Sequence, residues 1–221
     1  VAMHPDAVIF DFDGVIVDTE PIHYRAFQAI LEPLGLGYSW DVYTETYMGF
    51  DDRDAFREAY RASGMVLSDA ELGLLIDRKA HIFEDGITAG VTAYPGVIEL
   101  VRALSDKGVP LAICSGALKR DILPILKQLD IGPYFAHIVT ADDVAQSKPD
   151  PACYLLARQK LVASFPDKLT PAAIIYAIED TPAGIQAAKA AGLQVVGVSN
   201  SYPQAQLHAA DLVVASLEGL F

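Results

Sequence analysis

Short, continuous runs of hydrophobic residues occur once near the start of the chain and then repeatedly through its second half. The runs are rich in Val and Ile, and they are bounded by turn-forming residues. This pattern is typical of strands that are buried on both faces of a parallel sheet. The predicted strands are Ala7–Phe10, Val109–Cys114, Ile138–Val139, Ala173–Ile178, Gln194–Val198 and Leu212–Val214.

Between the later runs, hydrophobic residues recur every three or four positions, which predicts amphipathic helices. Leu100 and Leu104 belong to one such stripe, and Thr181 before Pro182 supplies an N-cap and a first-turn proline for another helix. Leu161–Leu169 shows no such period and is predicted to be a loop. Strands that alternate with helices predict an α/β fold with a doubly wound, Rossmann-like parallel sheet.

Residues 20–90 show helical periodicity and no convincing strand. Within them, Ser68 and Glu71 form a capping box, which predicts the start of a helix at this point. We therefore expect an inserted all-α cap domain, residues 20–90, and an α/β catalytic core formed by residues 1–19 and 91–221. Because the chain passes twice between the two domains, the cap is expected to act as a lid.

Polar residues follow several of the predicted strands, at the points where the strands end. They are Asp11, Asp13, Ser115, Gly116, Lys148, Glu179 and Asp180. The carboxyl ends of parallel strands lie along one edge of an open sheet, which is where such sheets bind ligands. We therefore expect these residues to converge on a single site.

The residue types at this edge suit phosphoryl transfer assisted by a metal ion. Carboxylates and water form the all-oxygen site that Mg²⁺ prefers. Lys148 and the Ser115 hydroxyl can hold a phosphate, and Gly14 and Gly116 allow backbone N–H groups to approach its oxygens. A carboxylate can attack phosphorus and form an aspartyl-phosphate once the metal and the lysine reduce the repulsion between the two anions.

Each of these residues also has an ordinary structural interpretation when taken alone. Asp-x-Asp-Gly could form a solvated turn, Ser115 a helix cap and Lys148 a surface charge. Only their joint placement favours a catalytic site. The chain has no Gly-Lys-Ser/Thr loop, which excludes a P-loop enzyme. Some histidines show no metal-ligand spacing and are expected to be structural: His4, His81, His137 and His208.

Composition and charge restrict the partners and the setting. The chain has 221 residues, of which 52% are hydrophobic, and a formal net charge of −13, which disfavours nucleic acid or an anionic membrane as a partner. No hydrophobic run approaches the roughly 18 residues of a membrane span, and no signal peptide is recognisable.

Cys114 and Cys153 lie outside any Cys-x-x-Cys pattern. We therefore expect no disulfide framework and a cytoplasmic location. Val1 and Ala2 precede Met3, and their origin is left open.

The strand-end motifs resemble those of the haloacid dehalogenase superfamily, in the same order along the chain. Asp11-Phe12-Asp13-Gly14-Val15 resembles motif I, and Ser115 resembles motif II. Lys148, within Ser-Lys-Pro-Asp-Pro, resembles motif III, and the run from Glu179 to Gly184 resembles motif IV. The helical insert resembles the type 1 cap of the family. The nearest branch resembles β-phosphoglucomutases and phosphoglycolate phosphatases.

The resemblance implies a role for each motif residue. Asp11 is expected to be the nucleophile and a Mg²⁺ ligand, and Asp13 the general acid and base, with its backbone carbonyl also on the metal. Asp180 is expected to bind the metal, and Glu179 to orient a metal-bound water. The transferring phosphoryl group is expected to be held by Ser115, Gly116 and Lys148. Because Asp13 can protonate a leaving alkoxide, ester chemistry is favoured over dehalogenation.

Resemblance also points to residues in the cap. Thr19 and His23 resemble residues that couple cap closure to Asp13 in β-phosphoglucomutases, and Lys79 resembles a residue that meets the substrate. The loop around Gly49 resembles the mutase specificity loop only in part.

In mutases that loop carries a lysine directly before the glycine and an arginine three residues after it. Here Met48 takes the first place, and Arg53 lies four residues after Gly49. A missing cation weakens the anchor that a mutase needs for a second phosphate, by about 1.5–3 kcal/mol for a charged hydrogen bond. This departure favours a phosphatase.

We therefore expect a Mg²⁺-dependent phosphatase that hydrolyses a small phosphate monoester, of the sugar phosphate or phosphoglycolate type, through an aspartyl-phosphate. A β-phosphoglucomutase-type isomerase is the main alternative. A non-catalytic phospho-accepting domain is a further alternative, although such receiver domains lack the Asp-x-Asp-Gly spacing and the helical insert. The expected partner is a small phosphorylated metabolite, and the protein is expected to be a monomer or weak dimer.

Overall fold

The computed structural model describes residues 4–221, so Val1 and Ala2 lie outside the described residues. The chain divides into two compact units. The first unit contains the described residues up to Asp18 together with Thr92–Phe221, and the second unit is Thr19–Val91. Each unit has its own hydrophobic core.

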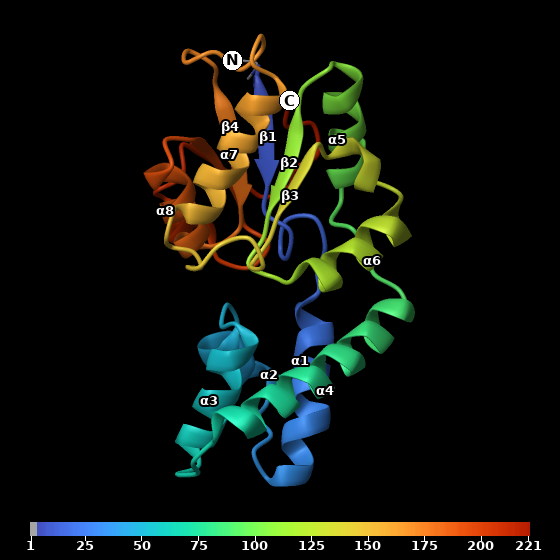
Figure 1. Ribbon diagram of the computed structural model, residues 1–221, viewed down its shortest axis with the longest axis vertical. Helices are drawn as coiled ribbons and strands as arrows, with labels where there is room; N and C mark the ends of the chain where they lie inside the picture. Colours follow the sequence, from blue (N-terminus) through green and yellow to red (C-terminus); the bar gives the residue numbers. More distant parts are fainter. Residues whose placement is uncertain (1–3) are drawn as a thin grey trace. The chain divides into compact units, whose positions relative to one another are not determined.

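A six-stranded parallel sheet with the order β3-β2-β1-β4-β5-β6 forms the centre of the first unit (Figure 1). The strands are β1 Ala7–Phe10, β2 Leu111–Cys114, β3 His137–Val139, β4 Ile175–Glu179, β5 Gln194–Val198 and β6 Leu212–Val214. Each overlaps a predicted strand, and the doubly wound fold is confirmed. The strand order changes direction between β1 and β4, which is the point where sheets of this kind bind ligands.

Helices cover both faces of this sheet. α5 (Val97–Asp106) and α6 (Lys119–Leu129) lie on one side, and α7 (Ala152–Ser164) and α8 (Pro182–Ala190) on the other (Figure 1). Alternate residues of a strand point to opposite faces, so Ile9 and Ala177 pack in the cluster under α7 and α8. The Thr181 hydroxyl accepts a hydrogen bond from the Gly184 amide at 3.0 Å, as an N-cap should. Short 3₁₀ turns complete the unit: η3 Gly132–Tyr134 and η4 Gln204–Leu207.

The prediction of a loop over Leu161–Leu169 is wrong at its start, because α7 continues to Ser164. Leu161 and Leu169 are both buried in the core. The helical period was hard to recognise because α7 also carries hydrophobic residues on its outer side, where Leu155 is 47% exposed. The contrast between the two faces of the helix is therefore small.

The two cysteines, for which no disulfide was predicted, are paired in the structure. Cys114 ends β2 and Cys153 lies in the first turn of α7, with their Cα atoms 6.1 Å apart. The pairing follows from the packing of α7 against β2, which no spacing in the sequence reveals.

The second unit, all of whose residues are described, consists of helices joined by turns and irregular loops, without a strand. Its main elements are α1 Glu20–Leu31, η1 Glu32–Leu34, α2 Trp40–Val42, the π-helical turn η2 Tyr43–Tyr47, α3 Asp52–Ala62 and α4 Asp69–Thr88. The predicted capping box is present, since Ser68 Oγ accepts from the Glu71 amide while the Glu71 carboxylate accepts from the Ser68 amide. Phe27 and Phe56 meet edge to face in the centre of the unit, with ring centroids 5.2 Å apart.

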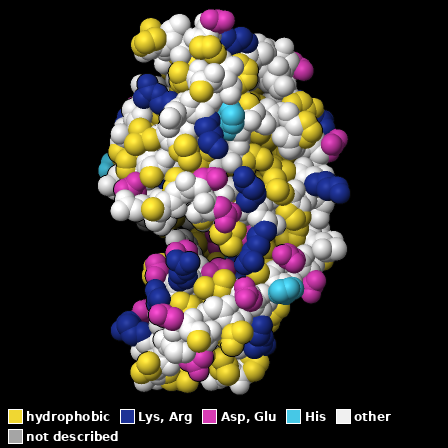
Figure 2. Space-filling view, viewed as in Figure 1, with side chains coloured by type: hydrophobic (Ala, Val, Ile, Leu, Met, Phe, Trp, Pro, Cys, Tyr) yellow, Lys and Arg dark blue, Asp and Glu magenta, His cyan; other side chains and the backbone are white. Residues whose placement is uncertain are grey.

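The surface carries charge of both signs. Figure 2 shows acidic and basic side chains interspersed with exposed hydrophobic ones over the viewed face. Acidic residues outnumber basic ones, 29 to 16. Among residues 4–221, no helix combines the length and the hydrophobicity that crossing a membrane requires.

Candidate active site

The carboxyl edge of the sheet gathers the predicted motif residues of the first unit. Asp11 directly follows β1, Ser115 follows β2, and Glu179 is the last residue of β4. Asp180 comes next, and Lys148 reaches the same edge from the loop between β3 and α7. The adjacency of β1 and β4 in the sheet therefore places carboxylates from two distant parts of the chain side by side.

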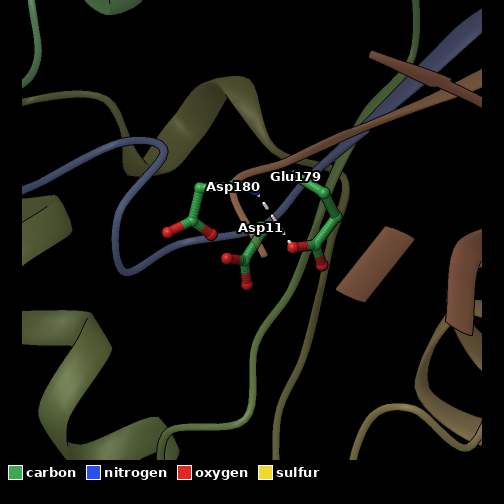
Figure 3. A group of neighbouring side chains, drawn as sticks. All are labelled: Asp11, Glu179 and Asp180. Carbon is green, nitrogen blue, oxygen red and sulfur yellow. Dashed lines mark hydrogen bonds between the residues drawn. The ribbon is translucent and has the colours of Figure 1, made fainter. Parts of the chain in front are cut away.

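Asp11, Glu179 and Asp180 form a buried carboxylate cluster, which we call the acid cluster. One oxygen of each residue lies within 4.8 Å of the others, and Figure 3 shows the Asp11 carboxyl group between the other two. Burial, together with the charges of Asp11 and Glu179, raises the pKa of Asp180 well above its ordinary value. A bound cation would relieve this repulsion.

Lys148 supplies a positive charge that partly neutralises the acid cluster. Its ammonium group donates to Asp11 Oδ1 at 2.8 Å, to Glu179 Oε1 at 2.6 Å and to the Cys114 carbonyl at 3.0 Å. Burial opposes the charged form, but the two carboxylates outweigh it and raise the pKa of Lys148 above its ordinary value. The lysine therefore stays charged and fixed against the predicted nucleophile.

The acid cluster also fits a divalent metal ion. Ser201 Oγ donates to Asp180 Oδ2 at 2.5 Å, whereas Asp180 Oδ1 is buried and has no hydrogen-bond partner among the described residues. An unsatisfied buried carboxylate oxygen is costly unless something binds it. Carboxylate oxygens are hard donors of the type that Mg²⁺ takes. Asp11 and Asp180 are therefore suited to hold such an ion.

Two glycines leave room for these carboxylates. A Cβ atom at Gly14 would overlap the Asp180 carboxylate, and the φ of +83° at Gly14 is itself unfavourable for other residues. A Cβ atom at Gly184, in the first turn of α8, would overlap the Glu179 carboxylate. The small residues of motifs I and IV thus permit close approach of the backbone to the acid cluster.

The remaining predicted residues of the first unit lie around this edge. Ser115 is buried, with its amide donating to the Val139 carbonyl at 2.9 Å and its hydroxyl accepting from the Ala117 amide at 3.0 Å. Gly116 is exposed in the same turn. Asp13 is half-buried in the loop after β1 and is not one of the three members of the acid cluster.

Sequence reasoning missed residues that hold the site in place. Tyr154 donates to Glu179 Oε1 at 2.5 Å, and Asn200 Nδ2 donates to the Gly14 carbonyl at 2.9 Å. Tyr154 resembles an ordinary core residue in a hydrophobic helix, so its pattern carried no functional signal. Asn200 and Ser201 follow β5, and their position at the carboxyl end of a strand was a usable signal.

The predicted cap residues lie in the second unit, where His23 and Lys79 come together. The Lys79 ammonium, almost fully buried, donates to Asp52 Oδ1 at 2.8 Å and lies 2.7 Å from His23 Nδ1. An ammonium group has no acceptor, so His23 Nδ1 must accept this hydrogen bond. Burial and the charge of Lys79 lower the pKa of His23 well below its ordinary value. Asp52 was not predicted as part of this group.

The other predicted cap residues are Thr19, Gly49 and Arg53. Gly49 and Arg53 are exposed, and Gly49 has a φ of +95°. Thr19 is buried and directly precedes α1.

Comparison with known proteins gives consistent matches over most of the chain. A family model described as haloacid dehalogenase-like hydrolase matches residues 8–198. A phosphorylated carbohydrates phosphatase of Thermotoga maritima is 31% identical over 198 residues, covering 89% of this chain and 86% of that protein. A β-phosphoglucomutase of Bacillus subtilis is 32% identical over 218 residues, covering 97% and 91%. The crystal structure of a β-phosphoglucomutase from Clostridium difficile has a TM-score of 0.83 at 26% identity, covering 99% of this chain and 94% of that chain.

Replacing Gly184 with alanine tests whether the close contact between this glycine and the Glu179 carboxylate matters for metal binding. In Gly184→Ala the added Cβ must displace the Glu179 carboxylate, and we expect a loss of Mg²⁺ affinity of about tenfold or more, as for other changes next to metal ligands. Gly73→Ala is the matched control, because Gly73 is also helical and a Cβ there meets nothing within 4 Å. Calorimetric titration with Mg²⁺ measures both variants. Affinity within twofold of wild type in Gly184→Ala would contradict the role of this glycine.

The buried His23 predicts a pH dependence of stability in the second unit. Its folded-state pKa lies below its unfolded value, so the unfolded chain binds the additional proton and stability is lost as the pH falls through about 6.5. The loss from this residue between pH 6.5 and 5.5 is expected to be about 1 kcal/mol. The surrounding charges of Lys79 and Asp52 stay in place in His23→Gln, which retains an acceptor for the lysine.

Urea unfolding at the two pH values, followed by fluorescence of Trp40, measures this effect, since the single tryptophan of the chain lies in the second unit. His23→Gln should lose about 1 kcal/mol less than wild type over this interval, because the carboxylates common to both proteins cancel in the comparison. Equal losses in the two proteins would show that His23 does not titrate in this way.

Proposed function

Since this chain belongs to the haloacid dehalogenase-like hydrolase family, we propose that it is a Mg²⁺-dependent phosphatase that hydrolyses a small phosphate monoester. The observation that carries the proposal is the Lys148 ammonium group, which donates to both Asp11 and Glu179 in an acid cluster whose third member, Asp180, has an unpartnered Oδ1 among the described residues. This arrangement suits a carboxylate nucleophile that must approach an anionic ester. A phosphorylated carbohydrates phosphatase among its relatives supports the same reaction class.

In the proposed reaction Asp11 attacks phosphorus and forms an aspartyl-phosphate, while the bond from phosphorus to the leaving oxygen breaks. Asp13 gives its proton to that oxygen and later removes a proton from the water that hydrolyses the intermediate. The phosphoryl oxygens are held by the Lys148 ammonium, the Ser115 hydroxyl and the Gly116 amide. Mg²⁺, when bound by Asp11 and Asp180 with the Asp13 carbonyl, reduces the negative charge that opposes the attack.

Glu179 is proposed to act differently from the other carboxylates. Its Oε1 accepts from both Lys148 and Tyr154, and its Oε2 accepts from the Asp180 amide at 3.3 Å. With donors on both oxygens, it is suited to anchor Lys148 and to orient a water on the metal rather than to take a full coordination position.

A β-phosphoglucomutase activity is the second candidate, because relatives and solved structures of that name match nearly the whole chain. The second unit argues against it. The residue three positions after Gly49 is Asp52, a carboxylate that pairs with Lys79. A mutase-type loop has an arginine at this position, and a carboxylate there repels a second phosphate instead of anchoring it. Membership of a hydrolase family favours catalysis over the non-catalytic alternative.

We further propose that the second unit is a substrate-selecting cap. The residues proposed to contact the substrate are those predicted from the sequence: Thr19, His23, Gly49, Arg53 and Lys79. A small phosphorylated metabolite is the proposed substrate, with the protein acting in the cytoplasm as a monomer or weak dimer.

The proposal is tested by measuring phosphate release from a panel of phosphorylated metabolites with and without Mg²⁺, including phosphoglycolate and β-glucose 1-phosphate. We expect Mg²⁺-dependent release from at least one monoester, and none from Asp11→Asn, which lacks the nucleophilic carboxylate. Conversion of β-glucose 1-phosphate to glucose 6-phosphate without phosphate release would instead establish the mutase. Full activity of Asp11→Asn would refute the covalent mechanism.

Asp13→Asn tests the general acid. Without this proton donor, kcat for a substrate with a poor leaving group should fall by about 10²–10⁴-fold, while a nitrophenyl phosphate, whose leaving group needs no proton, should be less affected in the first step. Burst kinetics that separate formation and hydrolysis of the intermediate measure the two steps. A uniformly small loss for alkyl phosphates would assign the acid role to another residue.

A further inference from the structure

Tyr154 is a buried polar residue next to the acid cluster that neither the sequence motifs nor the proposed reaction uses. It lies in α7 and has no exposed surface. Its ring packs in the hydrophobic cluster under the sheet, among residues such as Ala112 and Ala177. Its hydroxyl alone leaves that environment, and it donates to Glu179 Oε1 at 2.5 Å.

The hydroxyl adds a third hydrogen bond to a carboxylate that also accepts from the Lys148 ammonium and, more weakly, from the Asp180 amide. Glu179 Oε1 accepts from Lys148 at 2.6 Å and from Tyr154, and the Lys148 ammonium also lies 3.5 Å from the Tyr154 oxygen and 4.9 Å from the centre of its ring. A buried carboxylate needs several donors to offset the loss of hydration. Tyr154 therefore restrains two charged groups of the site at once.

This restraint affects how the Lys148 ammonium group divides its hydrogen bonds between Asp11 and Glu179. The ammonium is bonded to both Glu179 and Asp11. If the tyrosine hydroxyl were absent, Lys148 would be the one side-chain donor to Glu179 Oε1 left among residues 4–221, and the Glu179 carboxylate would be less restrained against turning toward Lys148 or toward Asp180. Either movement changes the arrangement of the oxygens that the acid cluster offers to a cation.

We propose that Tyr154 is a positioning residue: through the hydrogen bond from its hydroxyl to Glu179, it fixes the acid cluster and Lys148 in the arrangement that binds Mg²⁺ and the phosphoryl group. The inference rests on the proposed function, since it assigns the acid cluster to Mg²⁺. It adds a residue outside the strand-end motifs to the group on which the site depends.

Tyr154→Phe tests the inference, because it removes the hydroxyl and keeps the ring. In calorimetric titrations without substrate, we expect the Kd for Mg²⁺ to rise by about 10–100-fold, the range found for groups that orient metal ligands. The midpoint of thermal unfolding should fall by only a few degrees, because one hydrogen bond to a buried carboxylate is lost while the core packing of the ring is retained. The value of kcat should fall, and the Mg²⁺ concentration for half-maximal activity should rise in parallel with the Kd.

Two further variants separate positioning from packing. Tyr176→Phe is the matched control, since Tyr176 lies on β4 three residues before Glu179 and packs against Phe221, with ring centroids 5.6 Å apart. It should bind Mg²⁺ like wild type. Tyr154→Leu removes the ring as well, and it should lose stability but bind Mg²⁺ no more weakly than Tyr154→Phe.

A Kd for Mg²⁺ within twofold of wild type in Tyr154→Phe, whether or not Tyr154→Leu is impaired, would overturn the inference and leave Tyr154 a packing residue. The titration needs no turnover, so it is independent of the test of function. Wild-type protein that binds Mg²⁺ and releases no phosphate from any monoester would reject the proposed function, whereas the response of Tyr154→Phe would still decide the role of its hydroxyl.

Discussion

The ion pairs of Lys148 with Asp11 and Glu179 are the interaction on which the arrangement of the site depends. Asp11, Glu179 and Asp180 are buried together, and each would be costly in this environment without a positive partner. A single ammonium group bonded to two of them offsets part of that cost. Asp180 forms no ion pair with Lys148, and its Oδ1 has no hydrogen-bond partner among the described residues. The protein thus stabilises the cluster enough to fold while keeping an affinity for a cation.

The fold creates this arrangement by bringing strand ends together rather than through any local structure. β1 and β4 are neighbours in the sheet, so Asp11 lies beside residues that are far away in the sequence. Gly14, in the loop after β1, and Gly184, in the first turn of α8, then allow the backbone to approach the carboxylates closely. The Tyr154 hydroxyl donates to Glu179 Oε1, and the Ser201 hydroxyl donates to Asp180 Oδ2. The polar site is therefore supported from the hydrophobic core on one side and from the β5 loop on the other.

The second unit contains a buried cation with the same kind of support. Lys79 is almost fully buried, and it is satisfied by Asp52 and by the neutral ring of His23, with the rings of Phe27 and Phe83 about 5 Å from its ammonium group. Because Asp52 already balances this charge, Lys79 offers less attraction to an additional anion than its charge alone suggests. This weaker attraction supports the proposed hydrolysis of a single ester over an activity that needs two phosphates bound.

By itself, the sequence determined the strands, most of the helices and the residues at the strand ends, because periodicity and the alternation of strands with helices are local properties. It also predicted the convergence of Asp11 and Lys148, since parallel topology forces the carboxyl ends of strands to one edge. Only the tertiary structure showed that Tyr154 bonds to Glu179, 25 residues away, and that Ser201 bonds to Asp180, 21 residues away. A tyrosine in a hydrophobic helix has no pattern of its own, and the position of Ser201 after β5 does not show which carboxylate its hydroxyl meets. Their importance lies in where packing directs a single hydroxyl group, and packing is a property of the whole fold.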